Sequence, residues 1–253
     1  MFVQANNELE FLYNVSELCA GQAHGRDATW QLAPVFSCLR HNENSIYMME
    51  SFLSDLRVSI PKLCSHGERR ALKAFVNRND TITKPSYINR IDGAYFEYEG
   101  SQWDRLANNF VSEPLSGGLV FNVFHPNDLV NRRRPGYVPC LVSGSFLFHK
   151  NEVQLNAFFR SQSILEFGLF DLIFLRRFQS EFVDYIKALP KEAFPTRSRP
   201  KSISPGSLNL HFARVVIPSR LARNKREYMK RSEVFYDWSS ILVETIEEQF
   251  ALV

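Results

Sequence analysis

The sequence predicts an α+β protein in which a mixed or antiparallel sheet packs against one long, central, buried helix. Residues 167–189 are apolar at helical spacing, and this stretch is long enough for such a helix. Residues 141–148 and 152–159 are two β-rich runs separated by only three residues, which is typical of an antiparallel hairpin. Residues 7–20 add a helical pattern near the N-terminus.

Length and composition favour one packed domain that spans residues 1–253. The chain has 253 residues, of which 45% are hydrophobic and 23% charged, and it contains 22 phenylalanines. A chain of this length buries a substantial core without needing a second domain. Residues 190–206 are rich in proline and basic side chains, so we expect a solvated, flexible loop there.

The elements before the hairpin follow from the spacing of apolar residues. The helix over residues 7–20 ends near Gly21 and Gly25, and we expect a loop after it. Residues 46–56 and 68–77 have helical patterns, and residues 101–111 form a short helix that precedes a buried strand at 119–124. Residues 131–135 form a turn, and residues 208–217 a final strand after the long helix.

Charge, cysteine spacing and hydropathy exclude several classes of function. The net charge of +3 and pI near 8.7 suit a small anionic substrate, and the basic run at residues 220–231 has few aromatic residues, as a solvated face does. We therefore predict no nucleic-acid partner. The cysteines contain no CxxC pair, and the histidines have no metal-ligand spacing, so we predict reduced thiols in a cytoplasmic protein without a metal. No apolar leader or membrane span is visible.

One block of the sequence carries chemically informative residues. Cys140 follows a proline, Arg160 comes twenty residues after it and precedes Ser161, and Asp171 comes eleven residues after Arg160. Both spacings resemble those of the thymidylate synthase family, in which a Pro-Cys nucleophile is followed by an Arg-Ser pair and then by an asparagine that reads the base. The resemblance is close over residues 139–171 and weak elsewhere.

The resemblance implies a thymidylate synthase-like fold and covalent chemistry at Cys140. The thiolate would add to C6 of a pyrimidine nucleotide, and C5 would then attack the one-carbon donor 5,10-methylenetetrahydrofolate. Arg160 and Ser161 would bind the phosphate, and the guanidinium would stabilise the thiolate. Family members are homodimers whose sheets pack back to back, so we expect a homodimer. The other interpretation of Cys140 is a small buried hydrophobic residue.

Asp171 indicates which base would be read. The asparagine of the family both donates to and accepts from uracil, whereas an ionised carboxylate only accepts and would suit the amino group of cytosine. This exchange resembles the (d)CMP hydroxymethylases, so the expected reaction is 5-hydroxymethylation or methylation of a cytosine nucleotide. The alternative for Asp171 is a carboxylate that complements the dipole at the start of a helix.

Weaker similarity extends the candidate site to three further residues. Arg26, after Gly25, resembles the N-terminal phosphate-binding arginine of the family, and Glu50 resembles its catalytic glutamate, which would act as a proton-relay acid. Gly168 belongs to the substrate-binding segment before Asp171. The apolar C-terminal residues 250–253 loosely resemble the terminus that closes over folate in the family.

The chain also departs from the family pattern at the phosphate and sugar sites. Two phosphate-binding arginines of the family fall at Gly117 and Gly118, the histidine after the nucleophile is Leu141, and the His-x-Tyr that holds the ribose falls at Val216 and Pro218. Residues 132–134, three arginines, either replace the missing phosphate ligands or form a solvated loop. These departures leave a second reading open, a non-catalytic nucleotide-binding or regulatory relative. A nucleic-acid binder built on the basic tail is a weaker third reading.

Overall fold

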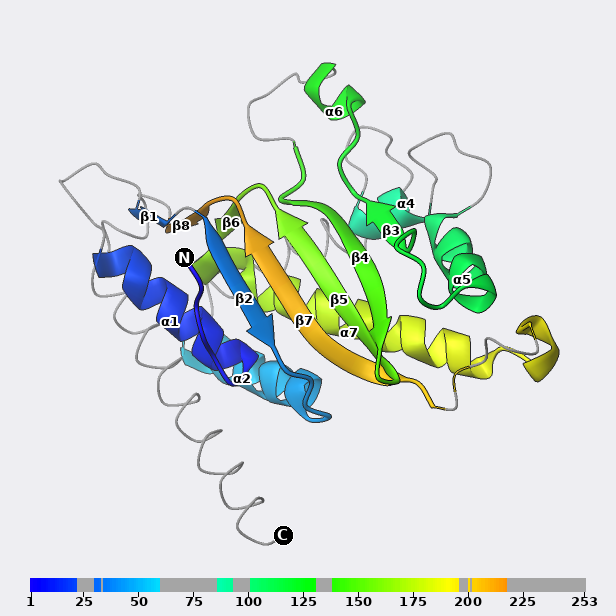
Figure 1. Cartoon of the computed structure of the whole chain (residues 1–253). Coiled ribbons are helices and arrows are strands. Elements are labelled where there is room, and N and C mark those ends of the chain that lie inside the picture. The colour runs from blue at the N-terminus through cyan, green and yellow to red at the C-terminus, as the bar shows by residue number, and fades with distance from the viewer. Residues whose placement is uncertain are drawn as a thin grey trace, which may run out of the picture.

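The structure, a computed structural model, describes residues 1–21, 30–32, 34–59, 86–92, 101–130, 138–195, 200 and 202–217. It confirms the predicted α+β class, because a mixed sheet packs against a long helix (Figure 1). The main sheet has five strands in the order β2 (Val35–Leu39), β7 (Ser204–Phe212), β5 (Glu152–Phe159), β4 (Leu141–His149) and β3 (Val120–Asn122). A smaller sheet of three strands contains β1 (Trp30–Leu32), β8 (Val215–Ile217) and β6 (Gln162–Ser163).

Helices cover one face and the ends of the main sheet. The long helix α7 (Leu169–Ala188) runs behind the sheet in Figure 1 and follows directly on a π-helical turn, η1 (Ile164–Gly168). The remaining helical elements are α1 (Glu8–Gly21), α2 (Ser45–Ser59), α4 (Tyr87–Ile91), α5 (Gln102–Ser112), α6 (Asn127–Val130) and the 3-10 turn η2 (Lys191–Ala193).

The β4–β5 hairpin is present as predicted, with a tighter turn than expected. His149 pairs with Glu152, so only Lys150 and Asn151 lie outside the ladder. Both have positive φ angles, 50° and 67°, as a two-residue type I′ turn requires. Asparagine tolerates this conformation better than most residues do, and the turn therefore fixes the register of the hairpin.

The pairing of β5 with β7 is parallel, while β2 with β7, β4 with β5, and β3 with β4 are antiparallel. A parallel pair needs a long crossover connection, and α7 is the main part of it here. Alternate residues of β5 (Val153, Leu155, Ala157 and Phe159) are buried. The sheet therefore presents one apolar face to α7.

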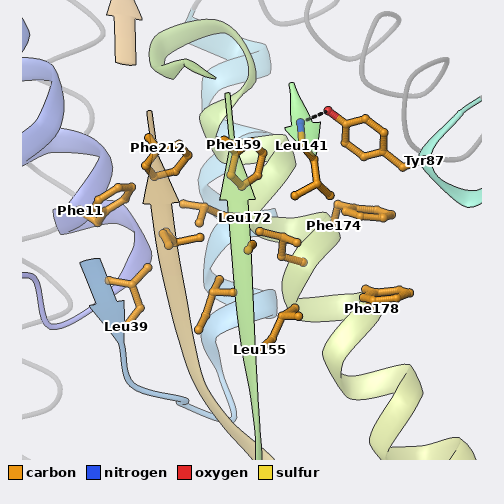
Figure 2. Packing of buried hydrophobic residues seen from close by; sticks show 14 of the residues in the cluster. Phe11, Leu39, Tyr87, Leu141, Leu155, Phe159, Leu172, Phe174, Phe178 and Phe212 are labelled. Carbon is orange, nitrogen blue, oxygen red and sulfur yellow. Dashed lines mark hydrogen bonds between the residues drawn. The ribbon is translucent and has the colours of Figure 1, made fainter. Parts of the chain in front are cut away.

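Aromatic rings of α7 pack against the sheet and against α5, and Figure 2 shows two of these rings, Phe174 and Phe178, beside the sheet. Phe178 of α7 stacks on Phe146 of β4 with ring centroids 5.6 Å apart, and Phe182 stacks on the same ring at 4.2 Å. Trp103 of α5 packs edge-on against Phe182 at 5.4 Å. Burying one such ring stabilises the fold by roughly 1.5–3 kcal/mol, so this cluster is a main source of stability.

A fully buried arginine joins elements that are distant in sequence. Arg176 of α7 donates from Nε to Glu8 of α1 at 2.6 Å. Its two terminal nitrogens donate to the Gln179 side chain and to the backbone oxygens of Leu39, Arg40 and Gly206. Because the guanidinium and the carboxylate are both buried, each needs the other to offset the loss of water.

Several predicted boundaries are wrong. The expected strand over 208–217 is two strands in different sheets, because the chain turns at Ala213 and Arg214 between β7 and β8. The expected loop over 190–206 overlaps β7, which begins at Ser204, and the long helix is preceded by η1. The short strand β2 and helix α4 were not predicted. The predicted helix at 68–77 and the turn at 131–135 lie outside the described residues.

Within the ranges given above, no helix has both the length and the hydropathy needed to cross a membrane.

Candidate functional site

Cys140 lies half-buried at the entrance to β4, and it is not part of a disulfide. The strand that follows carries a β-bulge, since Leu141 pairs with Phe159 while Ser143 pairs with Phe158. The extra residue is Val142, whose oxygen accepts from two successive amides of the chain after β3. Bulges are frequent beside active sites, and this one lies two residues after the cysteine.

Arg160 fastens the segment that carries Cys140. Its backbone amide donates to the Cys140 oxygen at 3.0 Å, and its Nε donates to the Pro139 oxygen at 2.9 Å. A terminal nitrogen also donates to the oxygen of Val138. Two of the five guanidinium N–H groups are thus committed to backbone. The expectation from the sequence was a guanidinium directed at a phosphate and the thiolate, and the structure adds this positioning contact.

Tyr87 is one residue of this region that the sequence did not indicate. Its hydroxyl accepts from the backbone amide of Leu141 at 3.3 Å, as the dashed line in Figure 2 shows. Burial raises the pKa of Tyr87 well above 10.0, and the charges of Asp171 and Cys140 raise it further. The phenol therefore contacts the residue next to the cysteine, and its pKa responds to the charge of the carboxylate that the sequence singled out.

The short helix α4 holds Tyr87 in place. Ser86 caps it, and a reciprocal contact with Asn89 completes a capping box. Arg90 forms a buried, bidentate ion pair with Asp128 at 2.8 and 3.0 Å, and it donates to the oxygen of Val123 at 2.8 Å. These contacts tie α4 to the chain after β3, on the side of the sheet where β4 begins.

Asp171 lies in the first turn of α7, where it is 3% exposed. One carboxylate oxygen, Oδ2, accepts from Nε2 of Gln162 at 2.6 Å, and the other, Oδ1, has no hydrogen-bond partner. Burial raises the pKa of Asp171 from 3.8 to about 7, although the bond from Gln162 lowers it. A carboxylate that served only the helix dipole would not need this burial, which costs free energy.

Gly168 lets the start of α7 approach α1. A Cβ at this position would lie 2.7 Å from Cδ2 of Leu12 and 3.0 Å from Cδ1 of Ile164, closer than real contacts. Gly168, Gln162 and Asp171 line a narrow interior gap, together with apolar side chains of α1, β5, η1, α7 and β7. The structure thus gives Gly168 a packing role beside the carboxylate.

Ser161, the other predicted phosphate ligand, is buried next to Arg160. Its hydroxyl accepts from a terminal nitrogen of Arg214 at 3.5 Å, and the oxygen of Arg214 accepts from the amide of Gln162 at 2.8 Å. Arg214, in the turn between β7 and β8, is exposed. A second guanidinium therefore stands beside the Arg-Ser pair, which sequence spacing did not indicate.

The structure does not bring Glu50 into this group. Glu50 lies on α2 and pairs with Arg177 on the exposed side of α7, with the two side chains 40% and 57% exposed. Arg177 is about 9 Å further along the helix than Asp171 and points in another direction. The predicted proton-relay role thus lacks a geometric basis. Arg26 lies outside the described residues, as do residues 132–134, Pro218 and the C-terminal segment 250–253.

The structure also shows where the residues that depart from the family pattern lie. Leu141 is fully buried in the core, and Val216 pairs with Ser163 in the small sheet. Gly117 and Gly118 lie in the turn before β3, where a Cβ on Gly117 would meet no atom within 4 Å. Packing therefore does not require a glycine at position 117, whereas a Cβ on Gly118 would lie 3.3 Å from Oγ of Ser116.

No family model matches the chain, and a search of curated proteins found no match. Among the residues that the structure describes, no group of three or more His, Cys, Asp or Glu side chains could hold a metal ion. The candidate site therefore rests on its own geometry and on the resemblance of its motif.

Proposed function

We propose that this protein is a pyrimidine C5 one-carbon transferase, a hydroxymethyl- or methyltransferase of nucleotide biosynthesis that acts on a (d)CMP-like cytosine nucleotide. Cys140 supplies the thiolate that adds to C6 of the base, and Asp171 accepts from the amino group at C4. The observation that carries the proposal is the hydrogen bond that the Tyr87 hydroxyl accepts from the amide of Leu141, next to Cys140, because the charges of Cys140 and Asp171 also raise the pKa of this phenol.

The grouping supports covalent chemistry because each member fits one requirement. Cys140 is half-buried, and Arg160 holds its backbone segment by hydrogen bonds to Pro139 and Val138. The phenol can hydrogen-bond to the thiolate, to the reacting base or to a water beside it. The buried carboxylate has an unpaired oxygen for a donor on the base. An unpaired buried acceptor costs about 1–3 kcal/mol, which a donor on the ligand would recover.

Phosphate recognition falls to Arg160, Ser161 and Arg214 in this proposal. The N–H groups of Arg160 that do not bond Val138 and Pro139 can still bind an anion, and Arg214 adds a second guanidinium next to the Ser161 hydroxyl. 5,10-Methylenetetrahydrofolate would supply the one-carbon unit. The C-terminal residues expected to contact folate are outside the described part of the chain, so none of the residues above is assigned to it.

A non-catalytic nucleotide-binding or regulatory protein is the second candidate. The observation that favours it is that Arg160 donates hydrogen bonds to the backbone oxygens of Val138 and Pro139. A guanidinium that already bonds to backbone oxygens stabilises a thiolate less. The buried Leu141 in place of the family's histidine also suits this reading. Both candidates keep the base-reading role of Asp171 and differ only in the reactivity of Cys140.

Mechanism-based labelling separates the two candidates. The protein is incubated with 5-fluoro-dCMP or 5-fluoro-CMP and methylenetetrahydrofolate, and its intact mass is measured. The proposal expects a covalent adduct that is lost in Cys140→Ala and kept in Cys38→Ala, which removes an exposed thiol elsewhere. Nucleotide binding without an adduct would favour the regulatory candidate. An adduct that survives in Cys140→Ala would refute the role of this cysteine.

The resemblance also carries the proposals of a homodimer and of a cytoplasmic location. Light scattering after size-exclusion chromatography tests the first, with a mass of about twice 29.3 kDa expected. A mass equal to one chain would contradict it.

A further inference from the structure

We infer that Gln162 and Asp171 form a paired acceptor site that receives both hydrogens of an exocyclic amino group on a heterocyclic base. This inference deepens the proposed function and rests on it for the nature of the ligand. It adds Gln162 as a specificity-determining residue, a role that neither its spacing nor the motif around it indicated.

The pair is defined by one hydrogen bond and two unpaired oxygens. Gln162 donates from Nε2 to Oδ2 of Asp171 at 2.6 Å, and this bond leaves Oε1 of Gln162 and Oδ1 of Asp171 without partners. Both residues are buried, with 1% and 3% of their surface exposed. Oε1 is bonded to the same carbon as the donating Nε2 of Gln162, and Oδ1 to the same carbon as the accepting Oδ2 of Asp171. Both residues line the same narrow interior gap.

Two buried, unpaired acceptors at one interior gap are unfavourable without a donor. Each costs about 1–3 kcal/mol in lost hydration, and most buried polar groups in proteins do have a partner. Gln179 shows the usual arrangement of a buried amide. Its oxygen accepts from Arg176, and its nitrogen donates to the backbone oxygens of Val153 and Gly206. The oxygens of the Gln162–Asp171 pair are thus an exception within the same core.

The chemistry of the pair selects one class of ligand. Both unpaired atoms are acceptors, so the complementary group must offer two donors from one small centre. An exocyclic amino group has two N–H bonds and fits this pattern, whereas the carbonyl at the same position of uracil offers only lone pairs and would be repelled. Burial raises the pKa of Asp171 to about 7, and the bond from Gln162 lowers it against that effect, so this bond increases the share of the carboxylate form that accepts.

The places of the two residues in the chain support a shared role beside Cys140. Gln162 begins β6, two residues after Arg160, which holds the cysteine segment. Asp171 begins α7 and raises the pKa of Tyr87, whose hydroxyl contacts the residue after Cys140. An amino group held by the pair would thus belong to a base within reach of the candidate nucleophile.

Nucleotide binding in the Cys140→Ala background tests the inference without any covalent step. Dissociation constants for dCMP and dUMP are measured by calorimetry, and the same measurement is made after adding Gln162→Met, which conserves volume and removes the amide. We expect affinity for dCMP to fall about tenfold, as for one lost hydrogen bond, while affinity for dUMP stays within about twofold. The preference for cytosine should shrink by the same factor.

Gln179→Met provides the matched control, since it removes an equally buried amide from the same core without touching the pair. It should leave the ratio of the two dissociation constants unchanged. Gln162→Asn withdraws the amide by one methylene and serves if Gln162→Met does not fold; it should also reduce the preference for dCMP. Equal losses for both nucleotides, an unchanged preference, or no binding of dCMP by the Cys140→Ala protein would overturn the inference.

The outcome is separable from that of the labelling experiment. A cytosine preference that depends on Gln162, seen without an adduct at Cys140, would support the paired acceptor site and refute the transferase. An adduct that forms equally well with 5-fluoro-dUMP would support the cysteine chemistry and overturn the paired site.

Discussion

The hydroxyl of Tyr87 accepts a hydrogen bond from the backbone amide of Leu141, the residue that directly follows Cys140. The two partners are 54 positions apart in sequence and belong to α4 and β4. Through this bond a buried phenol stands beside the candidate nucleophile.

Tyr87→Phe should slow adduct formation by about 100-fold, the scale of a lost proton-transfer or hydrogen-bonding group. The ring would keep its edge-on contact with Phe174, so the free energy of unfolding should fall by only about 1 kcal/mol. The rate is measured by intact mass at saturating 5-fluoro-dCMP. Tyr185→Phe, at a 40% exposed position on α7, is the control. An unchanged rate in Tyr87→Phe would remove the phenol from the mechanism.

Arg160→Lys should also slow the reaction, because an ammonium cannot reproduce the planar fork that bonds both Pro139 and Val138. Losing one charge-assisted bond would reduce the rate of adduct formation by roughly 10- to 100-fold. Arg177→Lys changes an exposed arginine of α7 and should leave the rate unaltered. Equal rates in the two variants would show that the fastening of Cys140 has no catalytic effect.

The stability of the protein should fall with rising pH through the titration of Asp171. Its carboxyl titrates near 3.8 when unfolded, whereas burial raises the pKa in the folded state to about 7. Between these values the folded state binds the extra proton, so its stability is complete below pH 4 and declines until about pH 7. The loss is on the order of 4 kcal/mol. Urea titrations should show a flatter profile in Asp171→Asn, and parallel profiles would contradict the shift.

Gly144→Ala should destabilise the sheet by about 1–3 kcal/mol or more. A Cβ on this strand would lie 2.4 Å from Cζ of Phe121 and 2.6 Å from the backbone oxygen of Asn156, and the backbone cannot move aside. Gly117→Ala is the matched control because open space surrounds that position, and it should change stability by less than about 0.5 kcal/mol. Chemical denaturation of both variants measures the two changes in the free energy of unfolding. Equal changes would contradict the steric conflict at Gly144.

Arg176→Met should destabilise the fold by about 3–5 kcal/mol, since it leaves Glu8 as a buried carboxylate without its cation. Arg177→Met, one residue further along α7, breaks only the exposed pair with Glu50 and should cost less than about 1 kcal/mol. Thermal unfolding distinguishes the two variants directly.

Glu50→Gln should leave the rate of adduct formation unchanged, and a large loss of rate would restore the catalytic role that the sequence suggested.

The elements that the sequence predicted are those whose evidence is local. The hairpin follows from two β-rich runs and a turn at Lys150 and Asn151, and the long helix from apolar spacing over one continuous segment. The boundary between β7 and β8 was missed because both strands are apolar and the break at Ala213 and Arg214 has no glycine or proline. The strand β2 was missed because it has five residues, too few for a clear alternation.

The candidate site divides in the same way. The sequence by itself determined the α+β class and singled out Cys140, Arg160 and Asp171, because their spacing along one stretch of chain is visible without coordinates. Only the tertiary structure decided that Tyr87 and Gln162 join them and that Glu50 does not. The physical reason is that burial and hydrogen bonding between distant segments depend on how strands and helices pack, and the order of residues in one segment carries no record of its partners.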